Sequence, residues 1–184
     1  MVEVRRLALD GVLEIRPARL GDERGFFSEV WSEKAFASAG IDLHFVQDNH
    51  SLSRDVGVLR GLHFQTPPMA QDKLVRVSRG AVFDVAVDIR SGSPTFGQWV
   101  GARLSAAEWN QMLIPKGFAH GFLALEPDTE VQYKVTAPYS REHDRAIRFD
   151  DPAIGIDWPI DPAALVLSDK DRSAPLLAEI ETGF

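Results

Sequence analysis

The sequence of 184 residues contains no cysteine. This absence excludes a disulfide framework, a zinc–thiolate site, an iron–sulfur cluster and a cysteine nucleophile. The sequence also lacks any run of about 18 apolar residues, so we expect no membrane-spanning helix and no membrane partner. Residues 1–17 contain no apolar stretch long enough for a signal peptide, and we therefore expect a cytoplasmic protein.

Basic residues are also fewer than acidic ones. The chain has 20 Lys and Arg against 27 Asp and Glu, which gives a formal net charge of −7. This charge argues against a nucleic-acid partner, because general nucleic-acid binders need a basic field. A small anionic ligand stays possible, since a few arginines can be focused in one cleft. With 45% hydrophobic residues and no internal repeat, the length predicts one domain over residues 1–184.

Helical patterns are few. Residues 31–40 fit a short helix, with Ser32 as N-cap and Gly40 just after its end. Residues 105–108 fit a capping box with one helical turn, and residues 173–181 fit a closing helix.

Strand-like segments dominate the rest of the chain. They are short and are separated by Gly, Pro, Asp and Ser, a spacing that predicts an all-β sandwich or barrel. The expected strands cover residues 11–20, 25–31, 58–64, 73–80, 81–89, 96–104, 111–115, 120–126 and 130–136.

Alternation within two of these strands assigns their faces. In 81–89, the apolar face carries Phe83 and Val85, while Asp84 lies on the opposite face. That opposite face either meets solvent or lines a cavity. In 58–64, alternation puts His63 and Arg60 on different faces.

His63, within "RGLHFQ", has three possible roles: a packed core residue, a metal ligand or a base. A metal site would use His63, His120 and His143, but the usual second histidine of such a site is missing, and the ammonium of Lys73 would repel a divalent ion. We therefore expect no metal.

Proton transfer is the second possibility. Histidine accepts protons near neutral pH, and a carboxylate partner makes it a more effective base by fixing its tautomer and stabilising the imidazolium. Asp84 and the acids of residues 167–171 are candidate partners, Tyr133 is a candidate acid, and Lys73 could stabilise an enolate. The same residues also fit structural roles, since Tyr133 suits a core and "SDKD" suits a helix cap.

Anion binding is the third possibility. Arg24, Arg60, Lys73 and Lys170 each stand beside a strand or turn, and guanidinium groups suit phosphate. Each of them also fits a solvated surface charge.

The motifs "RGLHFQ", "QDKLVRVSRG", "IPKGFAHGFLAL", "YKVTAPYS", "DPAIGIDWP" and "LSDKD" occur in this order between about residues 11 and 171. Together they closely resemble the dTDP-4-dehydrorhamnose 3,5-epimerase family. The resemblance implies a cupin-like jelly-roll β-barrel with a few short peripheral helices, a homodimer, and no metal or other cofactor.

The resemblance also implies roles for individual residues. His63 matches the base, Tyr133 the acid on the other face, and Lys73 the residue that stabilises the enolate. Asp171 matches the carboxylate that pairs with the histidine, and Asp84 a further acid in the cavity. Substrate-binding matches are Arg24, Glu29, Gln47, Asn49, Arg60, His120, Glu142 and Lys170, with Tyr139 stacking on the thymine ring.

The implied reaction inverts C3 and C5 of a dTDP-4-keto-6-deoxyhexose. An epimerase acting only at C3 or only at C5 is the alternative, and a ketoisomerase or a non-catalytic sugar-nucleotide binder are further rivals. In this reading Arg60 and His63 must both reach the substrate. Either a β-bulge at Gly61 brings them to one face, or Arg60 acts across a dimer interface.

Overall fold

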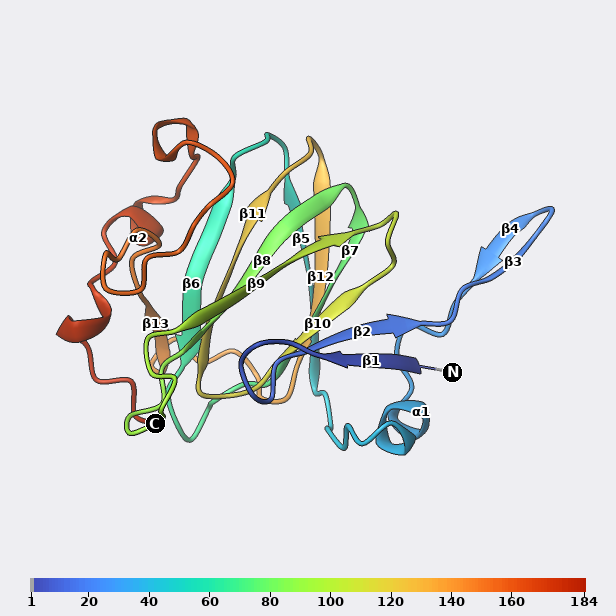
Figure 1. Ribbon diagram of the computed structural model, residues 1–184, viewed down its shortest axis with the longest axis horizontal. Helices are drawn as coiled ribbons and strands as arrows, with labels where there is room; N and C mark the ends of the chain where they lie inside the picture. The colour runs from blue at the N-terminus through green and yellow to red at the C-terminus, as the bar shows by residue number, and fades with distance from the viewer. Residues whose placement is uncertain (1) are drawn as a thin grey trace.

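The computed structural model describes residues 2–184, and most of its elements are antiparallel β-strands (Figure 1). The strands are β1 (Val2–Arg6), β2 (Leu13–Pro17), β3 (Leu20–Asp22), β4 (Gly25–Phe27), β5 (Gln47–Ser53), β6 (Leu59–Gln65), β7 (Lys73–Arg79), β8 (Ala81–Asp88), β9 (Trp99–Ser105), β10 (Gln111–Ile114), β11 (Phe118–Ala124), β12 (Thr129–Val135) and β13 (Asp144–Ala146).

Two sheets contain most of these strands. One has the order β1-β2-β10-β7-β12-β5, and the other has the order β13-β6-β11-β8-β9. The all-β prediction is therefore confirmed. Within residues 2–184, however, both sheets end in edge strands, so the closed barrel that we expected is not shown.

The main core lies between the two sheets. Val75 and Val131 face Ala86 and Phe122 across it, all of them buried. A second cluster covers the other side of the five-stranded sheet, where Leu62 and its neighbours pack under the segment from about residue 147 to the C-terminus. Both faces of this sheet are thus covered, so the side chains along its strands need not alternate between apolar and polar.

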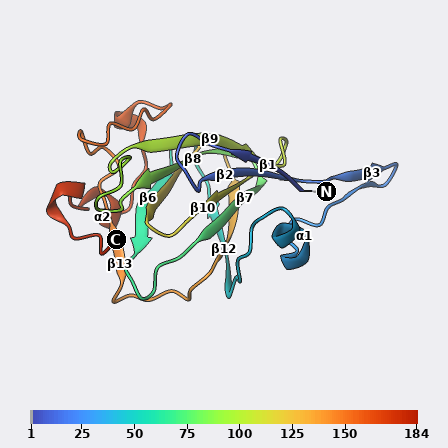
Figure 2. The same ribbon diagram turned by 60° about the horizontal axis from the view of Figure 1, so that its bottom comes forward.

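The N-terminal half adds two features outside this core. Helix α1 (Glu33–Ser38) is N-capped by Ser32, as predicted, and Phe36 within it packs on the six-stranded sheet. The hairpin β3–β4, which we call the arm (residues 18–30), projects away from the sheets in both ribbon views (Figures 1 and 2).

The predicted closing helix 173–181 is wrong. Only the 3₁₀ turn η2 (Leu177–Glu179) forms there, because the Asp151 carboxylate accepts the Leu177 N–H at 2.7 Å and Glu179 folds back to the N–H of Leu176. Residues 105–108 form a turn in which Ser105 Oγ caps the Glu108 N–H.

The remaining helical elements are short. They are α2 (Asp169–Arg172) and η1 (Pro162–Ala164), and both belong to the C-terminal part of the chain. Among residues 2–184, none of the helices has the length and apolar character needed to cross a membrane.

A β-bulge in β6 has the largest effect on the site. His63 pairs with His120 and Arg60 with Phe122, so two residues of β6, Gly61 and Leu62, oppose a single residue of β11. His120 and Phe122 point to the same side of β11, and the bulge therefore turns Arg60 and His63 to one side. Of the two explanations left open by the sequence, the structure has the bulge.

The bulge requires glycine at position 61. Gly61 has a φ of +135°, and a Cβ there would lie 2.5 Å from the Cα of Gly121 and 2.9 Å from the carbonyl oxygen of His120. Both atoms belong to the backbone, so the clash cannot be relieved by moving a side chain.

We therefore expect Gly61→Ala to lower the free energy of unfolding by about 2 kcal/mol or more, through backbone strain and overpacking. Urea denaturation measures this change. Gly25→Ala is the matched control, because Gly25 has a φ of +131° but nothing within 4 Å of an added Cβ. Equal losses for the two variants would contradict the role given to the backbone contact.

Candidate active site

A cavity of about 630 Å³ opens between the two sheets. Strands β6 and β11 line it from one sheet and β5, β7 and β12 from the other, while residues 166–171 close one side. Its volume lies in the range typical of small-molecule sites. Predicted site residues that line it are Gln47, Asn49, Arg60, His63, Lys73, His120, Tyr133, Tyr139, Lys170 and Asp171.

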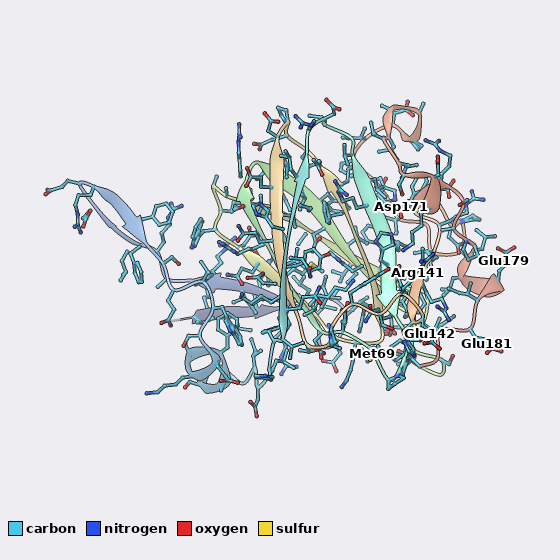
Figure 3. The ribbon with its side chains drawn as sticks, turned by 180° about the vertical axis from the view of Figure 1, so that it is seen from behind. Met69, Arg141, Glu142, Asp171, Glu179 and Glu181 are labelled. Atoms are coloured by element: carbon cyan, nitrogen blue, oxygen red, sulfur yellow. The ribbon has the colours of Figure 1, made fainter. Side chains whose placement is uncertain are left out.

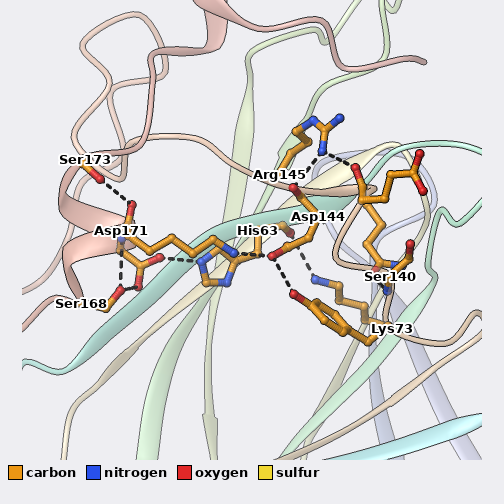
Figure 4. A network of polar contacts seen from close by, with 12 residues as sticks. His63, Lys73, Ser140, Asp144, Arg145, Ser168, Asp171 and Ser173 are labelled. Carbon is orange, nitrogen blue, oxygen red and sulfur yellow. Dashed lines mark hydrogen bonds and ion pairs between the residues drawn. The ribbon is translucent and has the colours of Figure 1, made fainter.

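His63 and Asp171 form a hydrogen-bonded pair in this cavity (Figure 4). His63 Nε2 lies 2.5 Å from Asp171 Oδ1, and the Asp171 side chain is buried. Ser168, the N-cap of α2, accepts the Asp171 N–H and donates its hydroxyl to Asp171 Oδ2 at 2.8 Å. Asp171 therefore has both roles suggested by the sequence, a helix-cap position and a histidine partner.

The charge state of Asp171 follows from these contacts. Burial opposes its ionisation, but the hydrogen bond and charge of His63, with help from Ser168 and Lys170, hold the pKa of Asp171 below its usual value. An ionised Asp171 accepts the Nε2–H of His63, which leaves Nδ1 as the proton acceptor of the ring.

Lys73 is a buried cation at the start of β7. Its Nζ donates to the backbone oxygen of His63 at 3.2 Å. Burial lowers the pKa of Lys73 to about 8, against the attraction of Asp84 and Asp144. Near neutral pH this ammonium is therefore still charged, in a place where a charge is weakly solvated.

Asp84 faces the inside of the molecule. Its Oδ1 lies 2.7 Å from His120 Nε2, and both side chains are buried. Burial lowers the pKa of His120, and Asp84 opposes that change. Asp84 therefore does not meet solvent, and it does not line the cavity directly either; it reaches the cavity only through His120, which does.

Tyr133 reaches the cavity from β12, in the sheet opposite His63. Burial raises the pKa of Tyr133 above its ordinary value, and Arg60 opposes this change. Its phenol therefore carries a proton at neutral pH. His63 and Tyr133 thus face one space from two sides.

Three predicted binding residues lie outside the cavity. Arg24 is on the exposed arm, where its guanidinium pairs with Asp22, and Glu29 is exposed at the base of the arm. Glu142 is exposed on the turn that precedes β13 (Figure 3). Within one copy of the chain, these side chains are not brought to the site.

Gln65 and Asp144 are among the cavity residues that were not predicted. Gln65 uses its whole amide to hold the loop of Tyr139: Nε2 donates to the oxygens of Met69 and Pro138, and Oε1 accepts the N–H of Ser140. Asp144 lines the cavity from β13. Gln65 stands in "RGLHFQ", so its place after His63 was a usable signal, whereas the three residues of β13 show no pattern.

The histidines considered as metal ligands do not converge. His63 and His120 are each paired with a carboxylate, and His143 Nδ1 lies 2.8 Å from the Ser140 hydroxyl. Across residues 2–184, no group of three or more His, Asp or Glu side chains is placed to hold a metal ion.

Known proteins resemble this chain along nearly its whole length. A family model described as dTDP-4-dehydrorhamnose 3,5-epimerase matches residues 6–179. The protein of that name from Sinorhizobium fredii is 56% identical over 178 residues, which cover 97% of this chain and 91% of that protein. The Escherichia coli protein of the same name is 51% identical over 180 residues, with 97% and 96% covered.

Solved structures agree. The dTDP-6-deoxy-D-glucose-3,5-epimerase of Legionella pneumophila, in complex with dTDP-4-keto-L-rhamnose, superposes with a TM-score of 0.94 at 48% identity, covering 98% of this chain and 95% of that one. A 3′-monoepimerase from Streptomyces bikiniensis, bound to dTDP-quinovose, has a TM-score of 0.87 at 35% identity over 94% and 86% of the two chains. The cupin-like fold is thereby confirmed, and the chain belongs to the dTDP-4-dehydrorhamnose 3,5-epimerase family.

Proposed function

We propose that this protein is a dTDP-4-dehydrorhamnose 3,5-epimerase, which inverts C3 and C5 of dTDP-4-dehydro-6-deoxy-D-glucose by acid/base chemistry next to the C4 ketone. One observation carries the proposal: a His63–Asp171 pair and Tyr133 face one cavity from opposite sheets, with Lys73 buried beside them. Relatives about half identical to the chain carry this name, whereas the 3′-monoepimerase from Streptomyces bikiniensis is less similar, at 35% identity.

His63 starts the reaction as the base. The C4 ketone makes the neighbouring C–H bonds acidic, and the free ring nitrogen of His63 accepts the proton. The ionised Asp171, 2.5 Å from the other nitrogen, stabilises the imidazolium that forms. This pairing fixes the tautomer before the substrate binds.

Lys73 stabilises the enolate. Removal of the proton moves negative charge to the C4 oxygen, and a buried ammonium interacts with that charge more strongly than an exposed one. The Lys73 ammonium is already in place before the substrate reacts, because its Nζ donates to the His63 carbonyl oxygen. A fixed donor needs no reorganisation when the enolate forms.

Tyr133 completes the inversion. A proton removed on the His63 side and returned from the opposite sheet arrives on the other face of the carbon. The raised pKa of Tyr133 keeps its phenol protonated and ready to donate. Two such events, at C3 and at C5, give the 4-keto-rhamnose configuration.

Groups remote from the reacting carbons bind the rest of the substrate. Arg60 and Lys170 lie in the cavity as cations for the diphosphate, and Tyr139, 59% exposed at its mouth, offers a ring for the thymine. Asp84, paired with His120, holds that imidazole towards the sugar. Binding energy gained there can be used to orient the sugar.

The arm supports a homodimer. Leu20, Phe26 and Phe27 are 67%, 54% and 70% exposed on a hairpin that extends away from its own sheets. Exposed apolar clusters of this kind mark interfaces. In our proposal the arm packs on a second copy and carries Arg24 and Glu29 to that copy's substrate. A single domain and a cytoplasmic location stay predictions.

Deuterium exchange tests the reaction. With dTDP-4-keto-6-deoxyglucose in D₂O, NMR should find label at both C3 and C5, and His63→Ala should lower exchange by about 10²-fold or more. Tyr133→Phe should keep exchange but lose net inversion. His50→Ala is the control, since His50 is exposed and pairs with Glu130 outside the cavity. Label at one carbon would support the single-site alternative, and no label would reject both.

Lys73 should also leave a signature in stability. Its pKa is about 8 in the folded protein and about 10.4 in an unfolded chain, so the unfolded state binds the extra proton between these values. The folded protein should therefore gain about 3 kcal/mol relative to Lys73→Met as pH rises through this window. Urea titrations of both proteins measure the difference, with the exposed Lys34→Met as control. A flat difference would contradict a depressed pKa.

The dimer is tested through Phe27. Replacing it with serine removes the most exposed apolar side chain of the arm, so Phe27→Ser should shift the mass measured by light scattering from dimer to monomer. Phe96→Ser is the control, because Phe96 is 45% exposed but lies in the turn between β8 and β9. A monomeric wild-type protein would reject the homodimer.

A further inference from the structure

Asp144 is a carboxylate in a cavity that, in our proposal, must accept a diphosphate. It lies on β13 with a side chain only 16% exposed. One oxygen, Oδ2, accepts from Lys170 Nζ at 2.5 Å and from the Tyr139 hydroxyl at 3.3 Å. In Figure 4 the Asp144 side chain points into the same space as His63 and Lys73.

This arrangement opposes substrate binding. A carboxylate repels the negative charges of a diphosphate, and it engages the ammonium of Lys170 that would otherwise meet them. A site built only for affinity would do better with a neutral side chain at this position. The contacts of this carboxylate therefore point to a role other than diphosphate binding.

Besides Lys170 and Tyr139, Asp144 also influences Lys73. Burial works against the Lys73 charge, Lys170 adds repulsion, and the two carboxylates that attract this ammonium are Asp84 and Asp144. Asp84 already bonds His120 at 2.7 Å. The titratable and charged groups that line the cavity with Lys73 are Arg60, His63, His120, Tyr133, Tyr139, Asp144, Lys170 and Asp171, and Asp84 lies behind His120.

We propose that Asp144 is a positioning residue of this reaction: it fixes Lys170 and Tyr139 at the cavity mouth, and its negative charge, in the same cavity, stabilises the ammonium of Lys73 that meets the enolate. The same negative charge weakens the affinity for the diphosphate. This inference rests on the proposed epimerase function and adds a role to its site.

Asp144→Asn tests the charge while keeping a similar shape and an acceptor for the Tyr139 hydroxyl. We expect dTDP to bind as tightly as to wild type or several-fold more tightly in calorimetry. We expect kcat at about pH 8 to fall about fivefold, because loss of a nearby opposite charge lowers the pKa of Lys73 by about one unit. The deficit should shrink at about pH 6, where Lys73 is protonated in both proteins.

Two further variants complete the design. Asp144→Glu keeps the negative charge and should therefore show the same alkaline limb of kcat as the wild type. This variant tests the charge even if Asp144→Asn folds poorly. Asp169→Asn removes one charge from exposed α2 and should leave the pH profile unchanged. A purely structural role for Asp144 would instead weaken dTDP binding and kcat together at every pH.

The outcomes separate the two proposals. An inactive wild-type protein rejects the epimerase function itself. If the wild type is active, an unchanged alkaline limb in Asp144→Asn, a parallel loss of dTDP affinity and kcat, or the same shift in Asp144→Glu overturns the role of Asp144.

Discussion

The close backbone approach of β6 and β11 at Gly61 and Gly121 determines how the site is built. The bulge it permits turns His63 into the cavity and the Leu62 side chain to the opposite face of the sheet. Along the edge of β6, Leu62 exchanges two backbone hydrogen bonds with Ile147, the residue that follows β13. The C-terminal segment is thus anchored behind β6, and its continuation brings Asp171 to the histidine on the cavity side. One local irregularity places both members of the pair.

Much of the fold could be predicted because period-two alternation is strong where a strand has one apolar face. Several of the segments that became β6 to β12 were instead recognised as short apolar runs between turn residues, since β8, β10 and β11 are buried on both faces. The strands that the sequence did not predict lack both signals: β1 (Val2–Arg6) is mostly exposed, β3 and β13 have three residues each, and β5 (Gln47–Ser53) is a polar edge strand whose inward side chains line a polar cavity. The closing helix failed because side-chain acceptors captured the backbone N–H groups of residues 176 and 177, a tertiary effect.

For the site, residue type was informative where few alternatives exist. His63, Lys73 and Tyr133 sit on strands, so alternation and chemistry together could place them near one cavity. The sequence could not decide which way Asp84 points. Both faces of its sheet are covered, so neither face can be identified as the solvent side from the alternation of residues. The contact between His63 and Asp171 joins residues 108 apart in sequence, and the position of Asp144 depends on a similar long-range fold.

The charges of the cavity explain how a chain of net charge −7 can attract an anion. Asp84, Asp144 and Asp171 are each already paired, with His120, Lys170 and His63 respectively. Arg60 and Lys73 instead donate to neutral oxygens: Arg60 to Leu52 and Ser53, Lys73 to His63. Their positive charge is therefore not cancelled by direct contact with a carboxylate, and in the proposed reaction it acts on the diphosphate and on the enolate. The local pairing of each charge, more than the total, makes the cavity receptive to a nucleotide sugar.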